Sequence, residues 1–137
     1  MDAVTFTRQL VDIESITGNE AAVGNYLYGE LCRLGYQTRK MPVEGDRFNV
    51  YAVSPDHENP TVVFSTHMDT VPPFIASSED AGRIYGRGSC DAKGIIAAQV
   101  AAAERLRRRP ESPLGPDKSL GGSPILAGRR PEAVRRV

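Results

Sequence analysis

Apolar residues recur at intervals of three and four positions in three stretches of the chain, and this spacing is typical of amphipathic helices. The apolar positions are Phe6, Leu10 and Ile13 in the first stretch, Val23, Leu27, Leu31 and Leu34 in the second, and Ile96, Val100 and Ala103 in the third. We therefore predict three helices. The first begins after Asp2, the second ends before Gly35, and the third runs from Ala92 to about Arg108.

The start of the second helix has a capping pattern of its own. Thr17 and Glu20 have the T-x-x-E spacing of a capping box, in which two side chains satisfy the free N–H groups of a helix start. We therefore expect the helix to begin directly after Thr17, with Thr17 as its N-cap.

Between the second and third helices the pattern changes to short runs typical of strands. Residues 36–41 and 47–54 are predicted strands, joined by the turn Glu44-Gly45-Asp46. Residues 61–65 (TVVFS) form an apolar run of the kind found in strands buried on both faces. A short extended segment, IYG, precedes the glycine-rich stretch GRGSCDAKG. This order of helices and strands predicts an α/β layer architecture.

The pattern breaks after Leu106. Residues 107–137 contain 5 of the 10 prolines and have no apolar period. They hold 8 Lys/Arg and 3 Asp/Glu, a net charge of +5, whereas residues 1–106 hold 9 and 14, a net charge of −5. We expect one domain over residues 1–106 and an Arg/Pro/Gly-rich, disordered tail over 107–137, without regular structure from about Pro110 onward.

Composition places the chain among ordinary soluble domains. Its 137 residues are 40% hydrophobic and 25% charged. Cys32 and Cys90 are too few for a disulfide framework, and their settings do not indicate a pair. No signal-peptide pattern opens the chain, and no stretch approaches the roughly 18 apolar residues of a membrane span. We expect a cytoplasmic protein without a membrane partner.

Two polar residues, His67 and Asp69, follow the apolar run 61–65. Residues two apart on a strand point to the same side, and ligands of open α/β sheets bind at the carboxyl ends of the strands. An imidazole beside a carboxylate suits a divalent metal ion. The alternative is a surface turn that leads into Pro72 and Pro73.

Asp91 is a third candidate, just before the predicted third helix. Gly86, Gly88 and Gly94 of the same stretch permit tight backbone paths near a ligand. Asp91 by itself could be a plain N-cap. A carboxylate at a helix start that points to a strand end also suits a metal, and only one loop and one short strand separate it from His67.

These motifs carry a family resemblance. THMDTVPP followed by IYGRGSCDAKG, with SITGNEAAVGNYLYGEL and LGY before them, resembles the aminoacylase/acetylornithine deacetylase/succinyl-diaminopimelate desuccinylase superfamily of zinc metallopeptidases. The resemblance covers roughly residues 3–106. It implies the N-terminal part of a zinc-peptidase-like catalytic domain, with helices packed on a mixed β-sheet and, here, an irregular C-terminal tail. It also implies hydrolysis of amide bonds in N-acyl amino acids or peptides, and TVPPF and DAKGIIAAQ look closest to the acetylornithine-deacetylase-like branch.

The resemblance assigns roles to the three candidates. His67 matches a ligand of one zinc ion, and Asp91 matches the carboxylate that bridges two zinc ions, for which cobalt can substitute. Asp69 matches a catalytic-site residue that does not bind metal but orients a neighbouring group and helps to set its basicity. In such enzymes a water acidified by the metals attacks an amide carbonyl, a glutamate acts as general base, and the following glutamate binds zinc.

The sequence departs from the family after Asp91. No Glu-Glu pair occurs, and the acids that follow are Glu104, Glu111, Asp117 and Glu132. The family's last histidine and its satellite domain for dimerisation are also missing, and His57, in a polar turn, is read as solvated. We therefore expect an incomplete chain, produced by truncation or by a change of reading frame. Alone it should bind zinc weakly and show no measurable activity.

Other reactive or charged residues have less specific readings. Cys90 could be a soft metal ligand but is read as a small loop residue, and Lys93 could steer an anionic substrate or be solvated surface. The arginines at 107–109, 129–130 and 135–136 could bind nucleic acid or an acidic membrane, but no aromatic residue lies among them, which favours a solvated tail. Three readings remain: a zinc-dependent amidohydrolase, an inactive fragment of one, and a small basic-tailed binding module.

Overall fold

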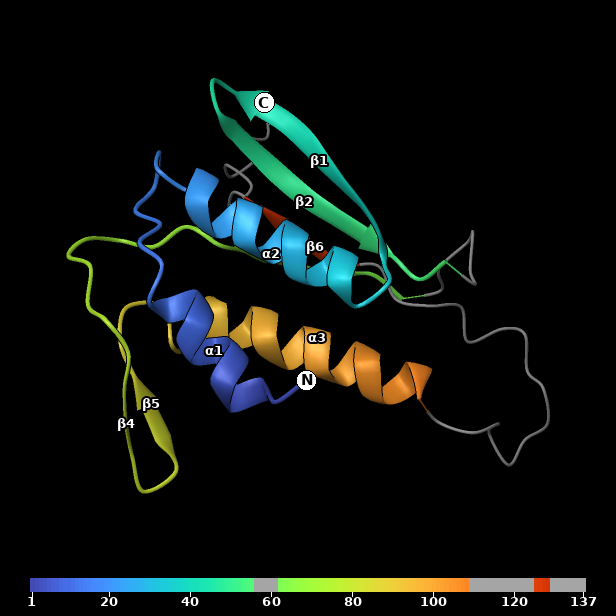
Figure 1. The fold of residues 1–137 in the computed structure, drawn as a ribbon. Helices are drawn as coiled ribbons and strands as arrows, with labels where there is room; N and C mark the ends of the chain where they lie inside the picture. Colours follow the sequence, from blue (N-terminus) through green and yellow to red (C-terminus); the bar gives the residue numbers. More distant parts are fainter. Residues whose placement is uncertain (56–61, 109–124, 129–137) are drawn as a thin grey trace, which may run out of the picture.

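The computed structural model describes residues 1–55, 62–108 and 125–128, and these form three helices and six strands (Figure 1). In chain order the elements are α1 (Ala3–Val11), α2 (Ala21–Arg33), β1 (Gln37–Glu44), β2 (Arg47–Val53), β3 (Phe64–His67), β4 (Ser78–Asp80), β5 (Arg83–Tyr85), α3 (Lys93–Arg107) and β6 (Ile125–Gly128). The three helices lie close to their predicted positions.

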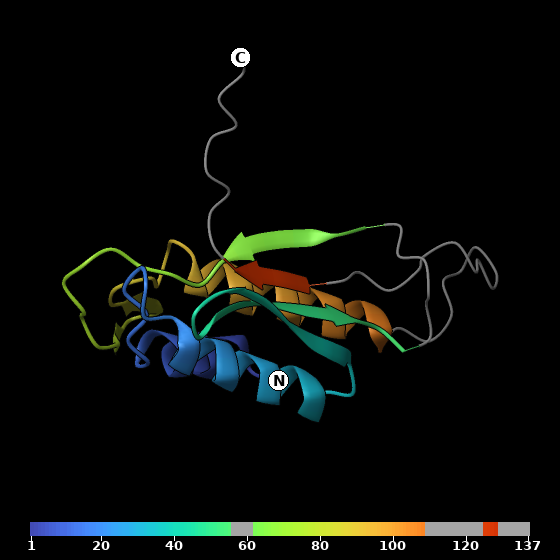
Figure 2. The same ribbon diagram turned by 90° about the horizontal axis from the view of Figure 1, so that it is seen from above.

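Four of the strands form a mixed sheet in the order β1-β2-β6-β3. The pairs β1–β2 and β2–β6 are antiparallel, whereas β3 and β6 run parallel. The helices lie along one face of this sheet (Figure 2): α2 packs on β1 and β2, α3 packs on β3 and β6, and α1 packs mainly against α3. The predicted α/β class, with helices on a mixed sheet, is therefore confirmed.

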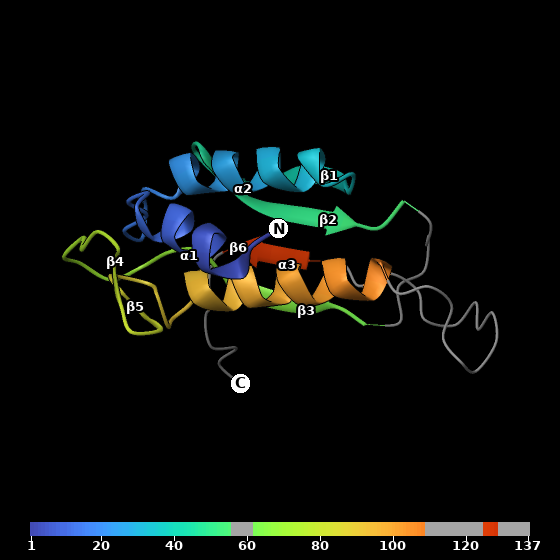
Figure 3. The same ribbon diagram turned by 60° about the horizontal axis from the view of Figure 1, so that its bottom comes forward.

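The hydrophobic core fills the space between the helices and the sheet. It contains most of the predicted stripe of each helix together with residues of β2 and the residue after β3: Phe6, Leu10, Val23, Leu27, Leu31, Val50, Ala52, Met68, Ile96, Val100 and Ala103, all buried. Ile13 and Leu34 of the predicted stripes are only partly buried and pack against this core. Burying one leucine-sized side chain contributes about 1.5–3 kcal/mol. This core fixes α3 along β6 and β3, as Figure 3 shows from below, and so fixes the start of α3 relative to the end of β3.

The predicted capping box is wrong. Helix α2 begins at Ala21, with Glu20 as the N-cap and no side-chain cap bond. The Glu20 carboxylate instead accepts the N–H of Gly18 at 2.9 Å and two bonds from the Arg47 guanidinium, at 2.9 and 2.7 Å. The Thr17 hydroxyl donates to Asp69 and does not cap the helix. A tertiary ion pair has taken the place of the local cap.

The strand predicted at 61–65 is displaced toward the carboxyl end. β3 spans Phe64–His67, and Val62 and Val63 are 46% and 58% exposed. The run is therefore not part of a strand buried on both faces, because the described helices cover only one face of the sheet. The displacement places His67 in the strand itself, at its last residue.

A small hairpin stands apart from the main sheet (Figure 1). β4 pairs antiparallel with β5, which corresponds to the predicted extended IYG segment. Gly82 makes the turn between the strands with φ of +90°. Cys32 and Cys90 are both free thiols. No helix of the described ranges is long and apolar enough to cross a membrane.

The structure also differs from the predicted irregular tail. Residues 125–128 form β6, which lies between β2 and β3 in the sheet. The prediction used side-chain periodicity, whereas a central strand is held through backbone bonds to both neighbours, which a short segment can make without any period. Helix α3 continues to Arg107, one residue past the predicted boundary between the domain and the tail at residue 106. The rest of the predicted tail, and His57, lie outside the described residues.

The Glu20–Arg47 pair should make stability depend on acid pH. Both side chains are largely buried, with 7% and 17% exposed. Burial opposes ionisation of Glu20, but the bonds from Arg47 and the Gly18 N–H outweigh it, so its pKa lies below the usual 4.5. The stabilisation is therefore fully present above pH 4.5 and is lost as pH falls through the folded-state pKa.

We predict that Glu20→Gln lowers the free energy of unfolding by about 2 kcal/mol at pH 7, because the amide cannot pair with the buried guanidinium. The loss should shrink as pH falls below 4.5. Urea unfolding at pH 7 and pH 3.5 measures both effects. Glu30→Gln is the control, since its partner Arg33 is 64% exposed, and it should change stability by less than about 0.5 kcal/mol. Equal losses in the two variants would contradict the prediction.

Candidate functional site

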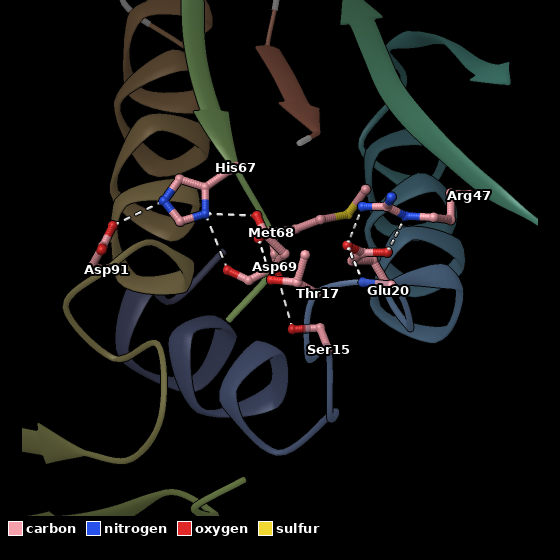
Figure 4. A network of polar contacts seen from close by, with 9 residues as sticks. Ser15, Thr17, Glu20, Arg47, His67, Met68, Asp69 and Asp91 are labelled. Carbon is pink, nitrogen blue, oxygen red and sulfur yellow. Dashed lines mark hydrogen bonds and ion pairs between the residues drawn. The ribbon is translucent and has the colours of Figure 1, made fainter. Parts of the chain in front are cut away.

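His67 ends β3, and both of its ring nitrogens face acceptor oxygens (Figure 4). Nδ1 lies 3.0 Å from Asp69 Oδ1 and 3.1 Å from the Asp69 backbone oxygen, and Nε2 lies 3.0 Å from Asp91 Oδ1. Nδ1 can donate a hydrogen to Asp69, which places two acceptor oxygens beside it. The Nε2 edge of the ring faces the carboxylate of Asp91, which is also an acceptor.

Asp69 is held from two sides. Its Oδ1 accepts from His67 Nδ1, and its Oδ2 accepts from the Thr17 hydroxyl at 2.8 Å. The side chains of His67 and Asp69 are only 14% and 11% exposed. The alternative of a surface turn is therefore wrong, because these side chains are largely buried and bond each other.

The backbone that presents Asp69 is clamped by the loop before α2. Thr70 N–H donates to Ser15 O at 2.8 Å, Thr17 N–H donates to Thr70 O at 3.1 Å, and Ile16 and Thr70 form a parallel bridge. The buried Ser15 hydroxyl donates to Met68 O at 2.8 Å. Residues 15–17 thus continue the pairing beyond the end of β3, and they bring Thr17 to Asp69.

Asp91 reaches the site from the start of α3. Its side chain is 59% exposed and contacts His67, whereas the N-cap of α3 is Ala92, without a side-chain cap bond. The peptide bond between Asp91 and Ala92 is cis. Because Asp91 lies before the N-cap and its side chain contacts His67, the alternative that Asp91 is a plain N-cap is wrong. The structure brings together all three residues that the sequence singled out.

The glycine-rich stretch before α3 needs its glycines for close approach. A Cβ atom on Gly94 would overlap the backbone oxygen of Ser89. Gly88 has a φ of +93°, and a Cβ there would lie 3.0–3.2 Å from the Lys93 stem and from Thr70. The loop therefore folds tightly against the first turn of α3, and this sets where Asp91 lies.

Lys93 is buried, with 1% exposed, and this excludes both readings that the sequence offered for it. Its ammonium donates to the Ile13 backbone oxygen in the loop after α1. Burial lowers the pKa of Lys93 to about 8, against the opposing attraction of Asp12 and Glu14. Its stem packs along Gly88. Lys93 therefore ties the start of α3 to the end of α1 and does not face a substrate.

A cavity of about 380 Å³ lies beside the cluster. Its lining consists of Thr17, His67, Asp69, Thr70, Val71, Asp91 and the loop 86–90. Cys90 lines it with an exposed side chain, as a loop residue would. Sequence reasoning missed Thr17 as part of this site, because its spacing from Glu20 indicated a cap.

His67 and Asp91 are residue types that bind zinc, but they are fewer than the protein ligands that a catalytic zinc ion takes. An imidazole nitrogen and a carboxylate oxygen are common zinc ligands, and a catalytic zinc takes three protein ligands. Within residues 1–55, 62–108 and 125–128, no group of three or more His, Cys, Asp or Glu side chains could hold a metal ion. His67 and Asp91 are therefore at most part of a ligand set.

Comparison with known proteins finds relatives of this chain. The sequence profile of peptidase family M20/M25/M40 matches residues 63–118, which include all three site residues. A protein named probable carboxypeptidase from Emericella nidulans is 44% identical, and the match covers 88% of this chain and 32% of that protein. One from Aspergillus terreus is 41% identical with the same shares. This chain matches the N-terminal portion of M20 peptidases.

Solved M20 structures share the fold. An M20 metallo-carboxypeptidase from Sulfolobus solfataricus superposes with a TM-score of 0.69 at 21% identity, over 93% of this chain and 31% of that one. A tripeptidase from Staphylococcus aureus gives 0.66 at 23%, over 91% and 35%. This chain spans about a third of the length of these M20 proteins and corresponds to the N-terminal portion of the catalytic domain.

The close approach at Gly94 leads to a prediction. We expect Gly94→Ala to lower the free energy of unfolding by about 2 kcal/mol, because the Cβ must push the Ser89 backbone away from α3. Urea unfolding measures the loss. Gly29→Ala is the control, because nothing lies within 4 Å of its Cβ and alanine favours the helix by about 0.5–1 kcal/mol. A Gly94→Ala variant as stable as Gly29→Ala would contradict the tight loop.

Proposed function

We propose that this chain carries one part of the metal site of an M20 metallopeptidase, with His67 and Asp91 as zinc ligands and Asp69 as the residue that orients His67. The observation behind the proposal is the 3.0 Å approach of His67 Nε2 to Asp91 Oδ1 beside a cavity. The two side chains lie on different elements, 24 positions apart in the sequence. The Nε2 edge of His67, which faces Asp91, is the edge that a metal ion would bind. The match to the M20 family supports the same assignment.

The roles of the three residues follow from their bonds. Asp69 holds the hydrogen on His67 Nδ1, which leaves Nε2 as the ligand atom. Asp91, with an exposed carboxylate, has two oxygens and can bridge two ions. Bound zinc supplies Lewis-acid chemistry for the hydrolysis of an amide bond. The cavity beside the residues has room for the end of a peptide.

Peptides are the substrate class we favour. The relatives cited above are named carboxypeptidases, and the solved structures include a metallo-carboxypeptidase and a tripeptidase. These names favour a peptide over an N-acetyl amino acid, so the deacetylase-like specificity becomes the second choice. The geometry of His67 and Asp91 suits either amide.

The chain alone should not complete the reaction. It contains no Glu-Glu pair, and general-base catalysis typically contributes about 10²–10⁴-fold. Glu104, on α3, cannot replace the missing base, because it is buried and bonded to Arg107 and Arg108. We propose that the remaining ligands and the base belong to the two thirds of M20 relatives that this chain does not match.

A basic-tailed binding module is the weaker alternative. Arg107, the first arginine of the predicted tail, donates to Leu34 O at 3.0 Å and to Glu104, and it lies 4.7 Å over the Tyr36 ring. An arginine with these partners anchors α3 and is not presented to a nucleic acid or membrane.

Cobalt and zinc titrations of the 137-residue chain test the metal site. We predict weak binding that His67→Ala and Asp91→Ala each remove, because each deletes one of two donors. His57→Ala, which removes the chain's other histidine, is the control and should bind like the wild type. Equal affinity in all four proteins would refute the site. The wild type should not hydrolyse dipeptides or N-acetyl amino acids, and turnover that Asp91→Ala abolishes would show that the chain is complete.

A chimera tests the substrate class. Residues 1–108 can replace the matching part of the Emericella nidulans relative, which is 44% identical. If the proposal is correct, the chimera hydrolyses peptides in preference to N-acetyl amino acids, and His67→Ala in the chimera abolishes this. A chimera that prefers N-acetyl amino acids would favour the deacetylase reading.

A further inference from the structure

We propose that Thr17 is a positioning residue for the metal site, acting through Asp69 on His67. The inference rests on the function proposed above and adds a residue to it. The observation behind it is that the Thr17 hydroxyl donates to Asp69 Oδ2 at 2.8 Å, while Oδ1 of the same carboxylate accepts from His67 Nδ1 at 3.0 Å. Figure 4 shows the three side chains in this order.

The Thr17 bond fixes the rotation of the Asp69 carboxylate. A carboxylate bonded through one oxygen can turn about its last torsion, which is broad and roughly two-fold. With Thr17 on Oδ2, only Oδ1 remains for the imidazole, and the plane of the carboxylate is set. The ring of His67 then presents Nε2 toward Asp91 in a single orientation.

Thr17 is itself placed by bonds that do not involve its hydroxyl. Its N–H donates to Thr70 O at 3.1 Å, and the next residue, Gly18, donates its N–H to Glu20 Oε1 at 2.9 Å. Arg47 from β2 holds Glu20. The loop is therefore anchored on both sides of Thr17, on the end of β3 and on the sheet.

This separation makes the hydroxyl testable by itself. Valine has the shape of threonine without the hydroxyl, so Thr17→Val keeps the backbone bonds and removes only the bond to Asp69. Thr17 is exposed at the cavity wall, but its hydroxyl bonds a carboxylate that is largely buried, so Thr17→Val removes one bond of that carboxylate and leaves the backbone bonds of the loop in place. A folded variant with a loosened Asp69 is the expected product.

The first measurement needs no metal. In ¹⁵N-histidine-labelled chain, at a pH where the rings are neutral, we expect His67 of the wild type to be mainly in the Nδ1–H form, because Nδ1 faces two oxygens of Asp69 whereas Nε2 faces the more exposed carboxylate of Asp91. Thr17→Val should move part of the population to the Nε2–H form, because Oδ1 no longer holds the hydrogen in place. Thr17→Ser should restore the wild-type spectrum, and His57 provides a reference signal in every sample.

The second measurement is zinc affinity. Removing an outer partner of a metal ligand typically weakens binding by 10–100-fold, and we expect about tenfold for Thr17→Val and less than about twofold for Thr17→Ser. Thr38→Val is the matched control. Thr38 lies on β1, outside the cavity lining, and its hydroxyl donates to Tyr36 O at 3.2 Å. It should leave both measurements unchanged.

The outcomes separate the two proposals. A Thr17→Val variant with the tautomer and zinc affinity of Thr38→Val would overturn the role of Thr17. If the wild type binds no zinc, the metal site fails, yet the tautomer still decides whether Thr17 positions Asp69. If Thr17→Val unfolds, the serine variant decides: a folded Thr17→Ser without the wild-type tautomer would contradict the role of the hydroxyl.

Discussion

The site depends on the short parallel ladder between residues 15–17 and residues 68–70. β3 ends at His67, yet the next residues remain paired, because Ser15 O accepts from Thr70 N–H and Thr70 O accepts from Thr17 N–H. Ser15 and Thr70 are 0% and 6% exposed, so their backbone groups cannot turn to water. Leaving one such group unpaired costs about 1–3 kcal/mol, and the chain beyond β3 is therefore held in an extended path.

The alternation of side chains along this path joins the core to the site. Met68 points to the helices, is 2% exposed and lies in the core, where it approaches Gly24. Its neighbours His67 and Asp69 point to the other side and bond each other. The packing of Met68 thus fixes the backbone from which both polar side chains extend.

The features that were predicted correctly depend on spacing, and those that were missed depend on distant contacts. The helical stripes have a period, and the convergence of His67, Asp69 and Asp91 was expected from a strand end and a helix start, whereas their roles stay predictions. Thr17 bonds a residue 52 positions away, and its pattern with Glu20 indicates a cap that a tertiary ion pair displaces. β6 was missed because a central strand needs backbone partners and not a pattern.

The two edges of the His67 ring are specified to different degrees. The Nδ1 edge has a complete set of partners within the described chain: the carboxylate and backbone oxygen of Asp69, with Thr17 behind them. The Nε2 edge faces Asp91, whose carboxylate is 59% exposed. The orientation of a metal-binding side chain is set by the one or two residues that hydrogen-bond to it. High affinity for a catalytic zinc ion, in contrast, needs three protein ligands at once. In the described residues the orientation of His67 is therefore set at its Nδ1 edge, although no group of three metal-binding side chains is present there. The bonds that orient His67 come from Asp69 and Thr17 of this chain and do not depend on further metal ligands.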